Sequence, residues 1–515
     1  MSQNQFSILL LNPPGRVRLG RDGLPTERKH CTPPLGLAYL AATLRQNSIP
    51  VNVIDALAEG YETERKIDNF IFYGLSDDQI ITRILLLKPA IVGISILFSN
   101  LANEALRLAR LIKTASSDTK ILLGGHHPSA MPFRILHDNQ HIDFVLSGEA
   151  DNTLVMLCKV LMSDGGQFEQ IRGCYWRSND GRVHGSDRNI PIEYKGFEFA
   201  YVSRKFSPNP SVDSLTFPAW DLFPMEAYWR SSVRLGASDT FRERYGVMVS
   251  TRGCPHICDF CTSPLMGGFK NYRKRDNHEV VDEILYLRSK YGIEEIQFLD
   301  DNFFVSRLRL KGLLKLISER CNGMLFSVPA GTEANTLDEE IIALLSNAGF
   351  YRITLAIESG NKEIQQSRID KKVDLDKVPQ TISLLRKYGI EVRAFFMIGF
   401  PGESRESIEN TADYALSLDL DDFAISVVTP LPGTPLYDEC FAKGLISEEF
   451  NPNDIRYSVA SIKIDNMTPE EIEQVRYETW KAHQEKKRRS RFNQKFQSRL
   501  EFQLAGFSSI ERPEV

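Results

Sequence analysis

The chain has 515 residues, of which 42% are hydrophobic and 25% charged, and its formal net charge at pH 7 is -5. These values are typical of a globular protein with two or three domains and exclude a disordered or fibrous chain. The slightly acidic balance gives no indication of nucleic-acid binding. No apolar stretch reaches the roughly 20 residues of a membrane-spanning helix, and the N-terminus lacks the features of a signal peptide. We therefore expect a cytoplasmic protein without a membrane span.

The N-terminal third alternates short apolar runs with helical patterns, for example at residues 35–47 and 101–113. This alternation predicts a five-stranded, doubly wound α/β domain of the Rossmann or flavodoxin-like type. Because no GxGxxG follows the first run, a dinucleotide is disfavoured, whereas a phosphate-bearing ligand remains possible. The predicted strands are residues 6–12, 51–55, 90–95, 120–125 and 143–149.

Glycines and polar residues follow four of these strands, in the segments NPPG, GIS, GGHHPSA and SGEAD. In an open parallel sheet, ligands bind beyond the carboxyl ends of the strands, where glycine lets the backbone come close. We therefore expect the ligand of this domain to contact these segments.

Three of the eight cysteines fall within eight positions, in the sequence CPHICDFC from Cys254 to Cys261. A structural zinc site needs four protein ligands, and only His256, inside the CxxxC loop, lies near as a fourth. Three thiolates fit a [4Fe-4S] cluster with one iron left open, while zinc remains the alternative. We expect the other five to be buried free thiols: Cys31, Cys158, Cys174, Cys321 and Cys440.

The sequence around and after the cysteines predicts six strands alternating with helices, and hence an incomplete parallel (β/α)6 barrel with right-handed crossovers. One predicted helix opens with Thr336 and Glu339 in capping-box spacing, and another ends before Gly292. Five of the six strands are located in the sequence, at residues 245–249, 294–299, 351–358, 392–399 and 422–430. The helices are located at 278–292, 336–349, 374–388 and 404–417.

The unusual residues of this half follow the predicted strands, at the barrel end where active sites gather. Each also has a simpler explanation: Asp301 and Asn302 would cap the next helix, and the ESG and GFPGE segments would be ordinary glycine turns. The segments concerned are the cysteines, Asp300–Asn302, Glu358–Gly360, Gly399–Gly402 and Pro430–Pro435.

CxxxCxxC with Phe260 before the third cysteine, followed by these loops, resembles the radical S-adenosylmethionine (SAM) superfamily. The resemblance implies that Cys254, Cys258 and Cys261 hold a [4Fe-4S] cluster whose open iron is chelated by the amino and carboxylate groups of SAM. It places Glu358 and Ser359 at the ribose or amino-acid portion of SAM, and residues 399–401 at the adenine. The implied SAM-binding residues are Phe260, Asp300, Asp301, Glu358, Ser359, Gly399, Phe400 and Pro401.

The N-terminal pattern, from LNPP through VGIS and GGHHPSA to SGEAD, resembles the cobalamin-binding domain of cobalamin-dependent radical SAM enzymes. Residues 213–224 resemble the linker that precedes their barrel. The resemblance implies a cobalamin-binding domain at 1–170, a linker at 171–240, a radical SAM domain at 241–440 and a helical region at 441–515. The implied cobalamin-binding residues are Asn12, Pro13, Pro14, Ser95, Gly124, Gly125, His127, Ser129, Gly148 and Glu149.

This chain departs from the pattern of cobalamin-binding domains at the loop that would coordinate cobalt. Domains that coordinate cobalt from below carry an Asp-x-His-x-x-Gly loop after the first strand, where this chain has Asn-Pro-Pro-Gly at residues 12–15. Cobalt would then lack a histidine ligand from that loop, and His126 and His127 are the nearby alternatives. His127 is expected to make backbone and tail contacts with cobalamin; cobalt ligation and a plain turn histidine are the alternatives for it. The alternative is a domain that keeps the fold but has lost the corrinoid.

The family's chemistry implies that a 5′-deoxyadenosyl radical activates an unactivated carbon of a small molecule, such as a secondary metabolite, lipid or tetrapyrrole. Methylcobalamin then donates the methyl group, and two SAM molecules are consumed for each methylation. The alternative is a non-methylating cyclase, ring-rearranging or hydrating enzyme. The pattern identifies no individual catalytic residue.

Two further classes fit less well. A methylthiotransferase would carry a second set of three cysteines in its N-terminal domain, and a cobalamin or redox sensor would not need the SAM loops. The resemblance also implies an electron donor such as flavodoxin or ferredoxin. The basic run at residues 486–489 is most simply a solvated helix face, and docking of an acidic donor is the alternative.

Overall fold

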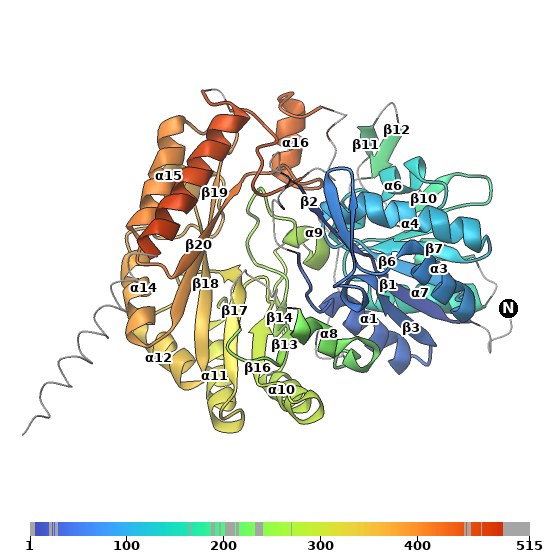
Figure 1. The fold of residues 1–515 in the computed structure, drawn as a ribbon, viewed down its shortest axis with the longest axis horizontal. Coiled ribbons are helices and arrows are strands. Elements are labelled where there is room, and N and C mark those ends of the chain that lie inside the picture. The colour runs from blue at the N-terminus through green and yellow to red at the C-terminus, as the bar shows by residue number, and fades with distance from the viewer. Residues whose placement is uncertain are drawn as a thin grey trace, which may run out of the picture.

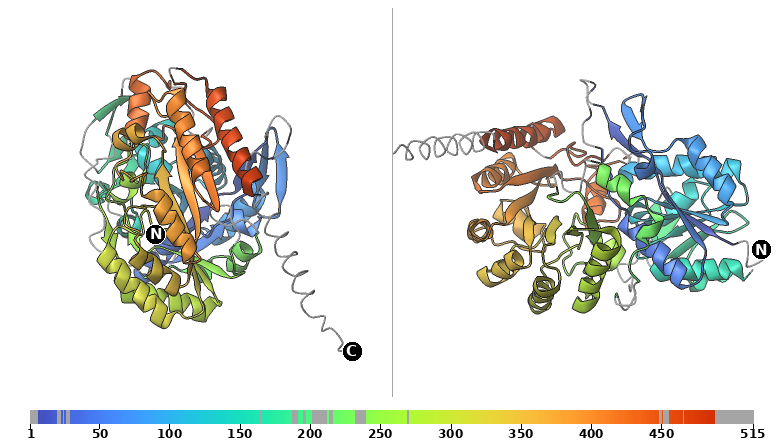
Figure 2. Two further views of the ribbon diagram at one scale, coloured as in Figure 1. Left: turned by 90° about the vertical axis from the view of Figure 1, so that its left-hand side faces the viewer. Right: turned by 60° about the horizontal axis from the view of Figure 1, so that its bottom comes forward.

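The computed structural model divides into two α/β lobes, joined by elements that include α8 (Met225–Arg230) and α9 (Ser263–Gly267) (Figure 1). The right-hand view of Figure 2 likewise shows the green elements of the chain between the lobes. Within the described residues, no helix is long and apolar enough to cross a membrane. The structure describes residues 6–19, 23, 25, 29–163, 166–186, 191–194, 197–200, 212, 216–231, 240–268, 270–447, 450, 455–464 and 466–487.

The N-terminal lobe contains a sheet in the order β10-β9-β8-β7-β6-β1-β3. The five predicted strands are present and parallel, in the flavodoxin-like order 2-1-3-4-5. No sequence pattern indicated β9 and β10, which add antiparallel strands within the range predicted as linker. The bounds are β1 (Ile8–Asn12), β3 (Val51–Asp55), β6 (Ile91–Ser95), β7 (Lys120–Gly124), β8 (Phe144–Leu146), β9 (Cys174–Arg177) and β10 (Val183–Gly185).

Successive residues of a strand point to opposite sides, so the apolar strands of this sheet have an apolar side chain on each face. Helices cover both faces. Ile8 and Leu10 of β1 belong to one buried cluster, and Leu9 and Leu11 to the other. A small antiparallel sheet of β2 (Gly15–Arg18), β5 (Phe70–Tyr73) and β4 (Glu64–Ile67) follows the end of β1. The helices are α1 (Leu35–Gln46), α2 (Ala56–Glu59), α3 (Asp77–Leu87), α4 (Ala102–Ala115), α5 (His126–Ala130), α6 (Pro132–Asp138) and α7 (Asp151–Met162).

The second lobe is a six-stranded parallel sheet in sequential order, which is the predicted partial barrel. The strand that the sequence did not locate is β17 (Leu325–Thr332), whose apolar run is interrupted by Pro329 and Gly331. The other strands are β13 (Tyr245–Met248), β16 (Glu295–Phe298), β18 (Phe350–Glu358), β19 (Glu391–Ile398) and β20 (Asp422–Val427).

The helices of the barrel follow the predicted spacing with one correction. Asp338, not Thr336, caps α12, because its side chain accepts the Ile341 N–H at 3.0 Å. Gly292 takes the left-handed conformation expected after α10. The helices are α10 (Asn277–Tyr291), α11 (Arg307–Arg320), α12 (Glu339–Asn347), α13 (Lys362–Ser367), α14 (Val378–Lys387), α15 (Arg405–Ser417) and α16 (Pro435–Ala442), and residues 469–487 are also helical.

The two edge strands of the incomplete barrel, β13 and β20, form hydrogen bonds with segments of the protein outside the barrel. The indole N–H of Trp229, in α8, donates to the Tyr245 carbonyl of β13 at 2.8 Å. On β20, the Val427 N–H donates to the Tyr457 carbonyl at 2.7 Å, and Arg476 Nε donates to the Ile425 carbonyl at 2.9 Å. Covering an edge removes a template for pairing with another chain.

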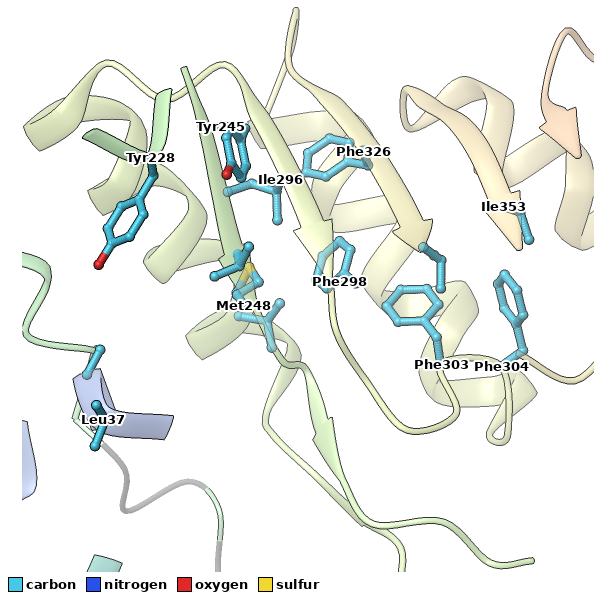
Figure 3. Close-up of a cluster of buried hydrophobic side chains, with 14 of the residues drawn as sticks. Leu37, Tyr228, Tyr245, Met248, Ile296, Phe298, Phe303, Phe304, Phe326 and Ile353 are labelled. Carbon is cyan, nitrogen blue, oxygen red and sulfur yellow. The ribbon is translucent and has the colours of Figure 1, made fainter. Parts of the chain in front are cut away.

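The lobes share a hydrophobic core. One cluster of buried residues includes Leu37 from the N-terminal lobe together with Tyr228, Tyr245 and Phe298 (Figure 3). Within the barrel, Phe298 of β16 stacks on Phe350 of β18 with ring centroids 5.9 Å apart. We infer that this shared cluster resists rotation of one lobe against the other.

A buried carboxylate links the end of the first strand to α8. Asp55 accepts hydrogen bonds from Asn12 Nδ2 at 2.9 Å, from the Ala58 N–H at 3.0 Å and from the Tyr228 hydroxyl at 2.5 Å. Burial raises the pKa of Asp55, and these hydrogen bonds oppose that shift. The first predicted cofactor loop and the interlobe helix are thus held by one side chain.

Removing the phenolic hydroxyl in Tyr228→Phe should lower the free energy of unfolding by about 1.5–3 kcal/mol, because a buried carboxylate loses a donor. Urea denaturation followed by circular dichroism would measure the loss. Tyr477→Phe, at a side chain that is 51% exposed, is the control and should change stability by less than about 0.5 kcal/mol. Equal effects of the two substitutions would contradict the role of Tyr228.

Candidate cofactor sites

Two aspartates after β16 fix the segment that carries the cysteines. The buried Asp300 carboxylate accepts the Ser250 hydroxyl at 2.7 Å and the Thr251 hydroxyl at 2.5 Å. Asp301 accepts the Gly253 N–H at 3.1 Å and the Ser263 hydroxyl at 2.6 Å. Since α11 begins only at Arg307, neither side chain caps a helix, and the simpler explanation for Asp301 is wrong.

The cysteine loop, residues 253–262, begins at a glycine that no other residue could replace without movement. Gly253 has φ +80°, and a Cβ there would lie 2.0 Å from the Asn271 carbonyl oxygen. Cys254 and Cys258 are buried and Cys261 is partly exposed. The remaining five cysteines are buried free thiols, as predicted.

Burial disfavours the ionised form of the thiols in the cysteine loop. Burial raises the pKa of Cys254 to about 12 and of Cys258 to about 11, and it also raises that of Cys261. Binding to iron would therefore release their protons at neutral pH. Among the described residues, no group of three or more Cys, His, Asp or Glu side chains has the arrangement of a single metal-ion site.

Loops after β18 and β19 bring further predicted residues to the cysteines. Glu358 has φ +68°, in the left-handed region, and Ser359 Oγ lies 3.1 Å from Thr411 Oγ1. The Glu403 carboxylate accepts the N–H groups of Gly399 and Phe400 at 2.8 and 2.9 Å. The Phe400 ring lies edge-on to Phe260, with centroids 5.9 Å apart.

Several charged residues near the cysteines were missed by the sequence analysis. Lys371 Nζ lies 2.9 Å from Glu358 Oε1. Burial lowers the pKa of Lys371, but Glu358 and the thiols of Cys258 and Cys261 raise it above its ordinary value overall. His256 Nε2 lies 3.0 Å from Glu333, which follows the unlocated strand β17. No motif indicated Lys371, whereas locating β17 would have indicated Glu333.

The glycine-rich ends of β7 and β8 meet in the N-terminal lobe. Gly125 has φ +114°, and a Cβ there would lie 2.4 Å from the Ile96 carbonyl oxygen. The Ser129 hydroxyl donates to the Gly125 carbonyl at 2.7 Å and accepts the Gly148 N–H at 2.9 Å. Ser95 pairs with Gly124 in the register of β6 and β7. These predicted residues therefore lie together.

The other predicted residues of this lobe differ in their surroundings. His127 Nδ1 lies 3.0 Å from the Ser99 hydroxyl, and burial lowers its pKa to about 4. Asn12 is the last residue of β1, and Pro13 and Pro14 follow it. Glu149 is engaged across the lobe boundary: its carboxylate pairs with Arg273 and lies 3.6 Å from Arg252.

The two sites face each other through α5 and α9. His126 Nδ1, in the glycine-rich segment after β7, lies 3.2 Å from the hydroxyl of Thr262, next to Cys261. Ser129 Oγ lies 3.4 Å from Met266 Sδ in α9. Nearby, Arg252 bonds the Asp151 carboxylate at 2.7 Å. The predicted cobalamin loop thus packs directly against the chain that follows the last cysteine.

Family models match both lobes. A B12 binding domain matches residues 23–157, and the radical SAM superfamily matches residues 248–415. The chain is 32% identical over 473 residues to cytidylyl-2-hydroxyethylphosphonate methyltransferase of Streptomyces wedmorensis, which covers 89% of this chain and 86% of that protein. It is 30% identical over 444 residues to an uncharacterized methyltransferase of Pyrococcus horikoshii, which covers 86% and 84% respectively.

An anaerobic magnesium-protoporphyrin IX monomethyl ester cyclase of Rubrivivax gelatinosus is 26% identical, covering 79% of this chain and 66% of that protein. Among solved structures, the radical SAM methyltransferase TsrM of Kitasatospora setae, with cobalamin and a [4Fe-4S] cluster bound, has a TM-score of 0.63 at 18% identity. The match covers 85% of this chain and 74% of that chain. This likeness concerns the fold.

The two lobes and the two family models define a cobalamin-dependent radical SAM enzyme. With relatives of 30% identity or more along most of its length, the chain belongs to the cobalamin-dependent radical SAM methyltransferases. Its cofactors are a [4Fe-4S] cluster, SAM and cobalamin. The fold class, the enzyme class and the cofactors predicted from the sequence are confirmed.

Gly253→Ala should abolish or severely reduce iron binding, because the new Cβ would displace the cysteine loop from Asn271. Iron content and absorbance of the reconstituted protein would measure this. Gly323→Ala is the matched control: its φ is +79° and nothing lies within 4 Å of the added carbon, so it meets only the backbone strain of about 1–2 kcal/mol. Full iron loading of Gly253→Ala would contradict the constraint.

Proposed function

We propose that this enzyme transfers a methyl group from methylcobalamin to an unactivated carbon of a small molecule held between the two cofactors. The observation that carries the proposal is the packing of α5 against α9 through His126 and Thr262 at 3.2 Å. It brings the predicted cobalamin loop next to the cysteine loop. A substrate between them would be within reach of both cofactors.

We propose that Cys254, Cys258 and Cys261 bind the cluster. Three thiols on one loop, two of them buried and one partly exposed, fit its need for three protein ligands and an open iron. His256 is engaged by Glu333, which disfavours it as a fourth ligand.

The remaining implied SAM residues divide by their contacts. Glu358, Ser359 and Phe260, with residues 399–401, are proposed to line the SAM site. Asp300 and Asp301 are proposed to support it, because their carboxylates already accept hydrogen bonds from the chain around the cysteines. The hydrogen bonds from Gly399 and Phe400 to Glu403 would hold that backbone in place for adenine.

Cobalamin is proposed to lie against the ends of β6, β7 and β8. There the glycines leave the backbone without side chains that would block its approach. Here Glu149 is proposed to position its loop through Arg273 and Arg252. We propose that no histidine of the first loop ligates cobalt and that His127 contacts the cofactor's periphery. The residues proposed to contact it are Asn12, Pro13, Pro14, Ser95, Gly124, Gly125, His127, Ser129 and Gly148.

When bound, the cluster and SAM supply a carbon radical that removes hydrogen from the substrate, and methylcobalamin supplies the methyl group. The chain's own contribution is to hold both sites in register and to exclude water. The bond between Arg252 and Asp151 contributes to this register, because Arg252 lies two residues before Cys254. No protein group needs to carry a proton in this scheme.

We further propose a flavodoxin or ferredoxin as electron donor and a cytoplasmic location. Lys486 and Lys487 of the predicted basic run are described, and Lys486 Nζ donates to the Leu416 carbonyl at 3.1 Å. Arg488 and Arg489 lie outside the described residues. As domain limits we keep 1–170, 241–440 and 441–515, with β9 and β10 in the linker range completing the N-terminal sheet.

A second candidate function is ring formation without methyl transfer. The similarity to magnesium-protoporphyrin IX monomethyl ester cyclases favours keeping it. The phosphonate named for the Streptomyces wedmorensis relative favours methylation of a small, polar metabolite. The two candidates differ in whether SAM is also consumed as a methyl donor.

Cys258→Ala should remove most of the iron and all SAM cleavage while leaving cobalamin binding largely intact, because cobalamin is assigned to the other lobe. Iron and cobalt quantitation after anaerobic reconstitution would check this. Cys321→Ala, at a buried cysteine outside the site, is the control and should retain iron. Cobalamin lost together with iron in Cys258→Ala would refute the assignment of the two cofactors to separate lobes.

With a true substrate, cobalamin and a strong reductant, the enzyme should form 5′-deoxyadenosine and S-adenosylhomocysteine in about equal amounts, since methylation consumes two SAM molecules. Chromatography of anaerobic reactions, with methyl-labelled SAM to trace the product, would measure this ratio. 5′-Deoxyadenosine alone, with cobalamin bound, would instead support the ring-forming candidate.

A further inference from the structure

A segment with no recognised motif packs along the cysteine loop. Residues 368–372, with the sequence RIDKK, follow α13. The Asp259 N–H donates to the Arg368 carbonyl at 3.3 Å, and the Ile257 N–H donates to Asp370 Oδ2 at 3.1 Å. The segment therefore bonds the residues on both sides of Cys258.

The side chain of Arg368 fixes this segment to the other loops of the site. It lies 3.0 Å from the Asp259 carboxylate and donates to the Pro401 carbonyl at 2.8 Å. It also bonds Glu439 of α16 at 2.5 Å. Because three elements share this guanidinium, the segment has a fixed position relative to the cysteines.

Lys371 is the cation that this segment places among the thiols. Its side chain is 11% exposed, and its ammonium lies 2.9 Å from Glu358 Oε1. Its neighbours Arg368 and Asp370 bond the backbone on both sides of Cys258, and the positive charge of Lys371 opposes the rise that burial causes in the pKa of Cys254, Cys258 and Cys261. The next residue, Lys372, is exposed.

We propose that Lys371 raises the reduction potential of the cluster and that Glu358, its ion-pair partner, lowers it. The inference rests on the proposed binding of the cluster by the three cysteines. In the reduction, one electron passes from an external low-potential one-electron donor to the cluster, and no bond forms or breaks. A fixed cation nearby stabilises the added negative charge, and a fixed carboxylate destabilises it.

The charges of the pair predict shifts of opposite sign. Lys371→Gln removes the cation and should make reduction of the cluster about tenfold less favourable, which corresponds to a potential about 59 mV more negative for a one-electron couple. Glu358→Gln removes the carboxylate and should shift the potential in the positive direction. A purely structural role for the pair would not give opposite shifts.

The experiment is an anaerobic redox titration of the reconstituted full chain without SAM, followed by electron paramagnetic resonance of the reduced cluster. Lys372→Gln makes the same change of charge at the exposed neighbour and should leave the potential unchanged. Lys371→Arg keeps the cation and should remain close to the parent enzyme. A Lys371→Gln potential equal to that of the parent, at full iron content, would overturn the proposal.

The outcomes separate this inference from the proposed function. If the parent chain binds no cluster, the assignment of the cysteines fails. If it binds the cluster but Lys371→Gln does not retain it, Glu358→Gln decides: a positive shift supports the proposal, and an unchanged or more negative potential overturns it. Shifts of both variants in the same direction also overturn it.

Discussion

The geometry of the cysteine loop depends on hydrogen bonds to carboxylates that lie outside it. Asp300 and Asp301 hold the chain before the first cysteine, and Asp301 also holds Ser263 after the last. Asp370 adds a bond to the Ile257 N–H beside Cys258. These hydrogen bonds give a loop without regular secondary structure a defined backbone path. This order avoids part of the conformational entropy cost of forming the site.

Ion pairs at the boundary between the lobes also help to position the cysteine loop. Arg252 precedes the cysteine loop and bonds Asp151 at the start of α7, while Arg273 bonds Glu149. Breaking a buried pair of this kind leaves an uncompensated charge and costs about 3–5 kcal/mol. The contacts that position the cysteines are thus continuous with those that hold the cobalamin-type lobe in place.

Strong local patterns made most of the fold predictable. The buried parallel strands read as continuous apolar runs, and Gly292 was recognisable as the residue that ends α10. Strand β17 was not located because Pro329 and Gly331 interrupt its run, and Thr336 was a wrong cap because the nearer Asp338 competes for the same N–H groups. The cysteines were predictable from spacing, whereas Lys371 was not, since only the fold brings it to them.

The C-terminal chain completes the edge of the barrel through a main-chain bond, from the Val427 N–H to the carbonyl of Tyr457. Every amino acid supplies that carbonyl, so the sheet edge places no demand on the side chain at position 457. The Tyr457 side chain is half exposed. A substitution at position 457 would therefore change the side chain at this edge of the barrel while leaving the main-chain bond to β20 in place.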